Sequence, residues 1–125
     1  RTTSASKYKL LIENEEEKGY DYKRLLNLSI KSWYDRTAVE SYSEILNGNL
    51  DEKEIETFPI KRHYGLIAED VYNAGLAEFV TFNDDGEIEG IEYDRLLTLL
   101  IPIVREQQQK IEQLEQEIAL MKGEV

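Results

Sequence analysis

The C-terminal quarter of the chain carries a seven-residue repeat of apolar residues, and this repeat sets the strongest limit on the fold. From Tyr93 onward helix-forming residues dominate, and with Leu97 at heptad position a the repeat runs for four heptads with one polar member. A repeat of this length predicts an α-helix that packs against other helices as a coiled coil. The predicted seam consists of Leu97, Leu100, Val104, Gln107, Ile111, Leu114, Ile118 and Met121.

Charged residues beside the predicted seam complement those of a second copy of the same chain. Lys110 at position g lies opposite Glu115 at the next e position of a parallel neighbour. Glu117 lies opposite Lys122 in the same way. Both pairs have opposite signs, which favours association between copies. The alternative is a single long helix that packs on its own domain.

The composition of the seam bears on the number of chains. β-branched residues at a with Leu at d suit dimers. Gln107 within the seam, and Ile101 and Ile103 at the flanking e and g positions, instead widen the stripe and favour three chains. We therefore expect a homotrimer. Pro102 marks either a kink or the first turn of the helix.

The residues before the heptads predict a small α+β domain, so we divide the chain into a globular domain at 1–95 and a coiled-coil helix at 96–125. Residues 36–57 are polar and predict a surface excursion with one helical patch at 50–55. The sequence Asn83-Asp84-Asp85-Gly86 predicts the turn of a β-hairpin. The other expected elements are a strand or helical turn at 8–12, a helix at 22–28, strands at 30–35 and 64–67, a helix at 68–77, and hairpin strands at 79–82 and 88–93.

The overall composition excludes several functions. The formal net charge of -11 would repel a phosphate backbone and an anionic lipid surface, so we expect neither nucleic-acid nor membrane binding. The chain has no cysteine, which excludes disulfides, a thiol nucleophile and thiolate metal ligands. The longest apolar run, 96–104, is much shorter than the roughly 20 residues of a membrane-spanning helix.

Residues with catalytic potential are few. A serine and a lysine can act as nucleophile and base when the amine is neutral, and Ser4 and Lys9 form one such pair. Spacing alone gives this pair no advantage over Ser6 with Lys7. His63, the sole histidine, is either part of a catalytic triad or a structural residue.

No metal or cofactor site is expected. One histidine without any cysteine argues against zinc. Asp84, Asp85 and Glu87 lack the regular ligand spacing of a calcium loop, so a polar hairpin turn is favoured there.

Several blocks of residues resemble one family of proteins. The block His63-Tyr64-Gly65-Leu66-Ile67-Ala68-Glu69-Asp70-Val71 is followed by Leu76-Ala77-Glu78-Phe79-Val80, by Asp85-Gly86 in the hairpin, and by Ile91-Glu92-Tyr93-Asp94-Arg95-Leu96 before the heptads. This succession resembles the endosialidase-type C-terminal intramolecular chaperones, a self-cleaving serine peptidase family of phage tailspikes, tail fibres and neck appendages. Residues 36–59 are unmatched and correspond to an insertion of variable length.

The resemblance implies a self-cleavage site near the amino end. The family carries a Ser, then four residues, then a Lys followed closely by Ile, and Ser4, Lys9 and Ile12 match this spacing. It implies that Ser4 attacks the carbonyl of Thr3, that neutral Lys9 is the base, and that the cut falls between Thr3 and Ser4. The family usually has Asp after the nucleophile, where this chain has Ala5. This departure and the presence of residues before Ser4 indicate an uncut or inactive form.

The resemblance also implies the function. The abrupt start of the chain predicts that it is part of a longer polypeptide. We expect a homotrimer that registers the upstream β-helical part of its own polypeptide during folding and is then released by a single self-cleavage, without a cofactor. The expected location is the host cytoplasm during virion assembly, with the mature upstream part in the virion tail or an appendage. His63 and Glu69 are candidates for supporting the site, although Glu69 fits a helix cap equally well.

Two other functions stay open at this point. The first is a permanent trimerisation module in which Ser4 and Lys9 are dispensable. The second is a receptor-binding tip, which predicts that the aromatic side chains of Trp33, Tyr34 and Tyr64 are exposed.

Overall fold

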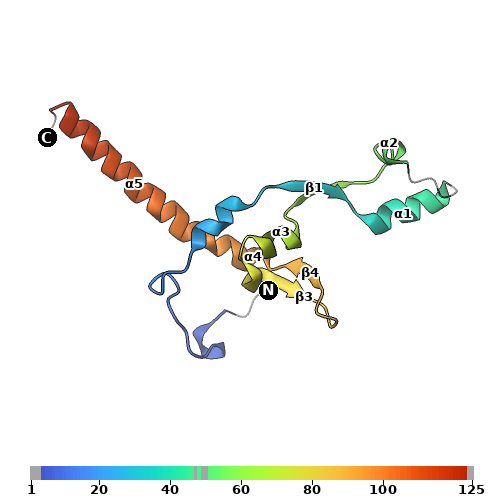
Figure 1. Ribbon diagram of the computed structural model, residues 1–125, viewed down its shortest axis with the longest axis horizontal. Helices are drawn as coiled ribbons and strands as arrows, with labels where there is room; N and C mark the ends of the chain where they lie inside the picture. The colour runs from blue at the N-terminus through green and yellow to red at the C-terminus, as the bar shows by residue number, and fades with distance from the viewer. Residues whose placement is uncertain (1–3, 47, 49–50, 124–125) are drawn as a thin grey trace. The chain divides into compact units, whose positions relative to one another are not determined.

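The computed structural model describes residues 4–46, 48 and 51–123. The fold is α+β, as predicted, with two small antiparallel sheets and a long C-terminal helix (Figure 1). The chain forms two compact units. The central unit is Arg24–Leu96, and the terminal unit combines the segment through Lys23 with the residues from Leu97 onward. The sequence had placed the N-terminal segment with the globular domain, whereas the structure groups it with the C-terminal helix.

The C-terminal helix forms as predicted from Tyr93 onward, with one tighter turn near its start. The helix α4 (Tyr93–Leu96) leads through the 3-10 turn η4 (Leu97–Leu99) into α5 (Leu100–Met121). Pro102 lies in the first turn of α5, where its missing N–H leaves no helical hydrogen bond unmade. Of the two expectations for Pro102, the first-turn position is therefore the one observed.

The first sheet of the central unit pairs β1 (Lys31–Tyr34) with β2 (Arg62–Gly65). The prediction of a strand at 64–67 was wrong by two residues, because the strand ends at Gly65. The backbone N–H of Leu66 donates to the hydroxyl of Tyr93 (2.9 Å), and this hydroxyl donates to the carbonyl oxygen of Leu66 (3.2 Å). Since both backbone groups of Leu66 are occupied by Tyr93, the chain leaves the ladder there.

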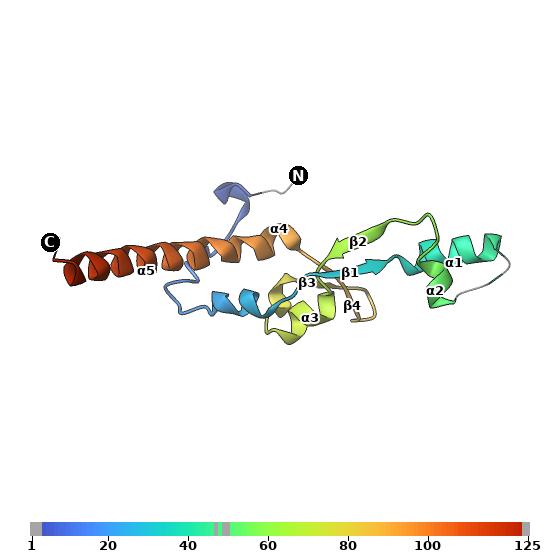
Figure 2. The ribbon, with the colours of Figure 1, turned by 90° about the horizontal axis from the view of Figure 1, so that it is seen from above.

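The described residues within 36–57 contain more helix than the predicted surface excursion. They contain α1 (Arg36–Ile45), which the sequence did not predict, and α2 (Glu52–Ile55), which overlaps the predicted helical patch; Leu50 lies outside the described residues. The Asp35 carboxylate caps α1 by accepting two backbone N–H bonds. Val39, Ser43 and Phe58 are buried, and the Tyr42 and Phe58 rings lie 4.6 Å apart. Figure 2 shows β1 leading to these helices and β2 returning from them.

The predicted hairpin is confirmed. Its strands are β3 (Val80–Phe82) and β4 (Ile88–Ile91), preceded by the 3-10 turn η3 (Ala77–Phe79). The side-chain oxygen of Asn83 accepts the backbone N–H groups of Asp85 and Glu87. Gly86 has a φ of +80°, which an L side chain rarely adopts. The turn chemistry therefore connects the two strands, which are slightly shorter than the predicted 79–82 and 88–93 and pair with one irregularity between Thr81 and Phe82.

The helix α3 (Ala68–Asn73) is shorter than the predicted helix at 68–77. Gly75 has a φ of +84°, and the N–H groups of Gly75 and Leu76 donate to the carbonyl oxygens of Tyr72 and Val71. This pair of bonds is a Schellman motif, which ends a helix and satisfies its last carbonyl groups. Val71 and Leu76 are fully buried in the central unit.

The N-terminal segment contains the 3-10 turn η1 (Ser6–Tyr8), and the boundary between the two units falls within a second 3-10 turn, η2 (Tyr22–Asn27). Of the two expectations for residues 8–12, the strand is not formed, and the turn that does form ends at Tyr8. Leu10 and Leu11 are each 93% exposed, and Leu11 has a φ of +53°. The helix predicted at 22–28 is present as the 3-10 turn η2.

Candidate functional site

The structure brings Ser4 and Lys9 together. The Nζ atom of Lys9 lies 3.0 Å from the Oγ atom of Ser4 and 2.5 Å from the Ser4 carbonyl oxygen. The turn η1 causes this approach, because the N–H of Tyr8 donates to the Ala5 carbonyl and that of Lys9 to the Ser6 carbonyl, both at 3.0 Å. The chain therefore reverses between the two side chains.

The competing pair is not formed. The Lys7 ammonium lies over the Tyr8 ring, 5.1 Å from its centroid. Thus the structure selects Ser4 with Lys9 from the two serine–lysine pairs that the sequence offers. The carbonyl of Thr3, at which the predicted cut falls, lies outside the described residues.

The geometry of the pair suits proton transfer, with one further requirement. A base must be within hydrogen-bond distance of the hydroxyl proton that it accepts, and 3.0 Å meets this condition. In this arrangement the amine donates to both Ser4 oxygens, so it positions the hydroxyl. It has to be neutral to accept the proton. Both side chains are exposed in the single chain.

The two residues suggested as site support belong to the central unit. His63 lies in β2, and its ring stacks on Trp33 with centroids 6.5 Å apart. Glu69 is exposed in the first turn of α3, where a carboxylate interacts favourably with the helix dipole. Their support of the Ser4–Lys9 pair stays a prediction. Among the three aromatic residues of the receptor-tip hypothesis, Trp33 and Tyr34 are half-buried and Tyr64 is exposed.

The N-terminal segment contacts α5 through ion pairs and a hydrogen bond that the sequence did not predict. The Nζ atom of Lys23 lies 2.7 Å from a Glu106 carboxylate oxygen, and the Tyr22 hydroxyl donates to the other oxygen at 3.1 Å. At the preceding residue of the helix, Arg105 pairs with Glu16. These partners are more than 80 residues apart, and no local pattern in the sequence marks them.

These contacts shift the ionisation of the residues involved. The hydrogen bond from Lys23 lowers the pKa of Glu106, and the bond from Tyr22 acts in the same direction. The same bond to Glu106 raises the pKa of Lys23. Burial, followed by the bond to Glu106, raises the pKa of Tyr22. The charged carboxylate and ammonium are therefore the favoured forms in this cluster.

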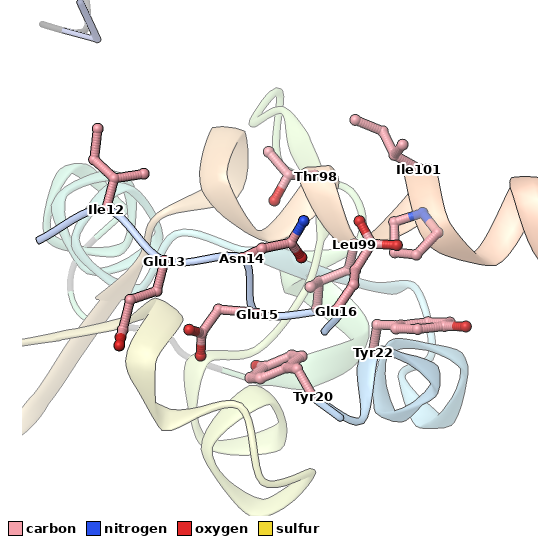
Figure 3. A pocket seen from close by; sticks show the side chains of 11 residues that line it. Ile12, Glu13, Asn14, Glu15, Glu16, Tyr20, Tyr22, Thr98, Leu99 and Ile101 are labelled. Carbon is pink, nitrogen blue, oxygen red and sulfur yellow. The ribbon is translucent and has the colours of Figure 1, made fainter. Parts of the chain in front are cut away.

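A hollow of about 510 Å³ lies between the N-terminal segment and the start of the C-terminal helix (Figure 3). Tyr20 and Tyr22 of the segment line one side of it, and Thr98 and Ile101 line it from the helix side. The wall also includes acidic residues of the run at 13–16, so the hollow does not suit an anionic ligand.

The predicted seam is an exposed stripe along α5. Its apolar members are between 41% and 87% exposed, and Gln107 is exposed among them. Leu99 and Ile103, by contrast, are only 7% and 4% exposed. The helix thus buries one face within its own chain and leaves the heptad face open.

One part of the trimer argument was wrong. Ile103 at position g is buried within its own chain, so it cannot widen the seam. Ile101 at position e is 59% exposed and remains available beside Leu100 and Val104. Lys110 and Lys122 make no ion pair within the described residues, which leaves both free for a neighbouring chain.

Other site types find no support in the described part of the chain. No group of three His, Asp or Glu side chains there is placed to hold a metal ion. No helix among the described residues has both the length and the apolar character needed to cross a membrane.

Comparison with protein-family models, with curated proteins and with solved structures found no match. The resemblance to the intramolecular chaperones therefore rests on the residue blocks alone.

Proposed function

We propose that this chain is a C-terminal intramolecular chaperone that trimerises, registers the upstream β-helical fibre or appendage portion of its own polypeptide, and is then released by self-cleavage between Thr3 and Ser4. The observation that carries the proposal is the 3.0 Å approach of Lys9 Nζ to Ser4 Oγ. The exposed heptad seam supports the assembly part of the proposal.

The proposed chemistry is an acyl shift followed by hydrolysis. The Oγ atom of Ser4 attacks the carbonyl carbon of Thr3 while its proton moves to neutral Lys9. The peptide C–N bond then breaks, and Lys9 returns the proton to the Ser4 nitrogen. The resulting ester between Thr3 and Ser4 reacts with one water molecule, which leaves a carboxylate on Thr3 and restores the serine hydroxyl. One turnover is sufficient.

In the proposed mechanism, assembly removes water from the pair. Lys9 is exposed here, and an amine loses its proton more readily when other chains remove water from it. The exposed apolar residues beside it, Leu10 to Ile12, offer a surface for such burial. Cleavage would then follow trimerisation and leave time for the upstream chains to fold.

The folding role follows from the cost of non-local pairing. Three chains of a β-helical fibre must find partners far apart in sequence and in separate molecules, which is slow. Joining them at one end lowers the entropic cost of the first pairing. Release of the module afterwards leaves the fibre kinetically trapped, because refolding would need the lost part.

The test uses the polypeptide with its upstream stalk, analysed by mass spectrometry and by sedimentation. We expect two fragments with a new amino terminus at Ser4. Ser4→Ala and Lys9→Ala should stay whole, while the matched controls Ser6→Ala and Lys7→Ala should be cleaved normally. An uncleaved parent that still forms trimers would refute the peptidase role.

A permanent trimerisation module is the second candidate. It is favoured by Ala5, which departs from the family pattern, and by the exposure of both members of the pair. In that case all five proteins of the test remain whole and trimeric.

A further inference from the structure

Gln107 occupies an unusual place on α5. It is the one polar residue in the seam and lies between Val104 and Ile111. Neighbouring glutamines bond to carboxylates one turn further on: Gln108 donates to Glu112 (3.1 Å) and Gln113 to Glu117 (3.3 Å).

Gln107 cannot bond in this way, because the residue four positions on is Ile111. No hydrogen bond of its side chain is present among the described residues, and the amide is exposed on the face proposed to meet other chains. In a coiled coil this amide would leave water. It then needs a partner that its own helix does not provide.

Three parallel chains in the same heptad register would supply that partner. Each amide has both donors and an acceptor, so three Gln107 side chains in one layer can bond to one another. A slip by one heptad would place Gln107 opposite Leu100 or Leu114, where nothing can bond to it. We propose that Gln107 fixes the parallel, in-register alignment of the three chains; this inference rests on the proposed trimer.

The charges beside the seam point to the same alignment. In register, Lys110 faces Glu115 and Glu117 faces Lys122 of the next chain. A slip by one heptad instead brings Lys110 opposite Lys122 or Glu117 opposite Glu115, depending on its direction. Salt screens this contribution, since the Debye length falls to about 3 Å at 1 M ionic strength. The bonds of a buried amide layer are screened much less, so the two effects can be separated.

Register has a direct consequence for the upstream chain. A slip of seven residues moves one helix by about 10 Å along its axis. A β-strand rises about 3.3 Å per residue, so this error equals about three residues of strand register. A module that aligns three β-helical chains therefore has to exclude it.

The test measures alignment and mass together. The chain has no cysteine, so Gln116→Cys at the outer position f places one spin label per chain, and sedimentation gives the mass. We expect a trimer with one narrow inter-label distance, at low salt and at about 1 M salt. Adding Gln107→Leu should raise the melting temperature but produce a second distance or a second mass at high salt. Gln107→Asn, which keeps an amide, should retain one alignment.

Gln109→Leu is the matched control, because position 109 faces away from the seam. It should change neither the mass nor the distances. A Gln107→Leu trimer that keeps one distance and one mass at high salt would overturn the role of Gln107 while leaving the proposed trimer intact. A labelled parent that sediments as a monomer would overturn both.

Discussion

Gly65 lies in one of the residue blocks on which the family resemblance rests and faces Tyr93 of another, so its replacement gives a sharp test of the central unit. A Cβ atom at position 65 would lie 2.8 Å from the Tyr93 hydroxyl oxygen and 3.2 Å from the Trp33 ring. The first distance is too short, so the hydroxyl would have to move. That hydroxyl makes both hydrogen bonds to Leu66.

The expected magnitude follows from these two bonds. Each contributes about 0.5–1.5 kcal/mol net, so Gly65→Ala should lower the free energy of unfolding by about 1–3 kcal/mol. The loss is partly offset by about 0.4–1 kcal/mol, because alanine restricts the unfolded chain more than glycine does. Urea unfolding can be followed by the fluorescence of Trp33, the sole tryptophan, which touches the site.

A double-mutant cycle isolates the cause. Tyr93→Phe removes the hydroxyl and its bonds but keeps the ring, so it should cost a similar amount. In that background Gly65→Ala has no hydroxyl to displace and should cost much less than in the parent. Equal costs of Gly65→Ala in the two backgrounds would refute the steric argument.

Two further predictions concern a helix end and pH. Gly75→Ala should destabilise the central unit by about 1–2 kcal/mol, because position 75 has a left-handed backbone, and by more because a Cβ atom there would lie 2.9 Å from Arg24. Gly86→Ala is the control: position 86 has a similar φ but nothing within 4 Å, so it should show only the backbone effect in urea unfolding. The Glu106 carboxyl has a lowered pKa and the Lys23 amine a raised one. Their ion pair should therefore hold the N-terminal segment on α5 between about pH 5 and 10, and it should weaken in acid as Glu106 is protonated and in base as Lys23 loses its proton. Hydrogen exchange of residues 13–23 should show this window. Glu106→Gln should lower protection near pH 7 and leave a smaller loss on the acid side, because the Arg105–Glu16 pair remains; an unchanged acid profile would contradict the assignment.

The elements that the sequence predicted correctly are those whose causes are local. The hairpin follows from Asn83 and Gly86 within one turn, and the C-terminal helix follows from its own heptads. Two of the elements that were missed or displaced depend on more distant partners, whereas α3 ends at a local signal, Gly75. The helix α1 is polar in composition and is held by Phe58, and β2 ends early because of Tyr93.

The same distinction applies to the candidate site. The spacing of Ser4 and Lys9 alone did not separate them from Ser6 and Lys7, and only the turn η1 shows which pair meets. The contacts of Glu106 with Tyr22 and Lys23, and of Arg105 with Glu16, had no signal in the sequence, because each joins residues more than 80 positions apart.

The exposure of α5 predicts that assembly and folding of this helix are coupled in the proposed trimer. Leu99, just before α5, and Ile103 within it are buried in the chain, and among the described residues the last ion pair between the N-terminal segment and α5 is at Glu106. Beyond that residue the helix is exposed apart from a partly covered Ala119. An isolated helix of about 15 residues is only marginally stable in water. In the proposed trimer, the seam from Gln107 to Met121 would therefore gain its stability from the other chains, so the residues proposed to select the partners are also those that would need them to remain helical.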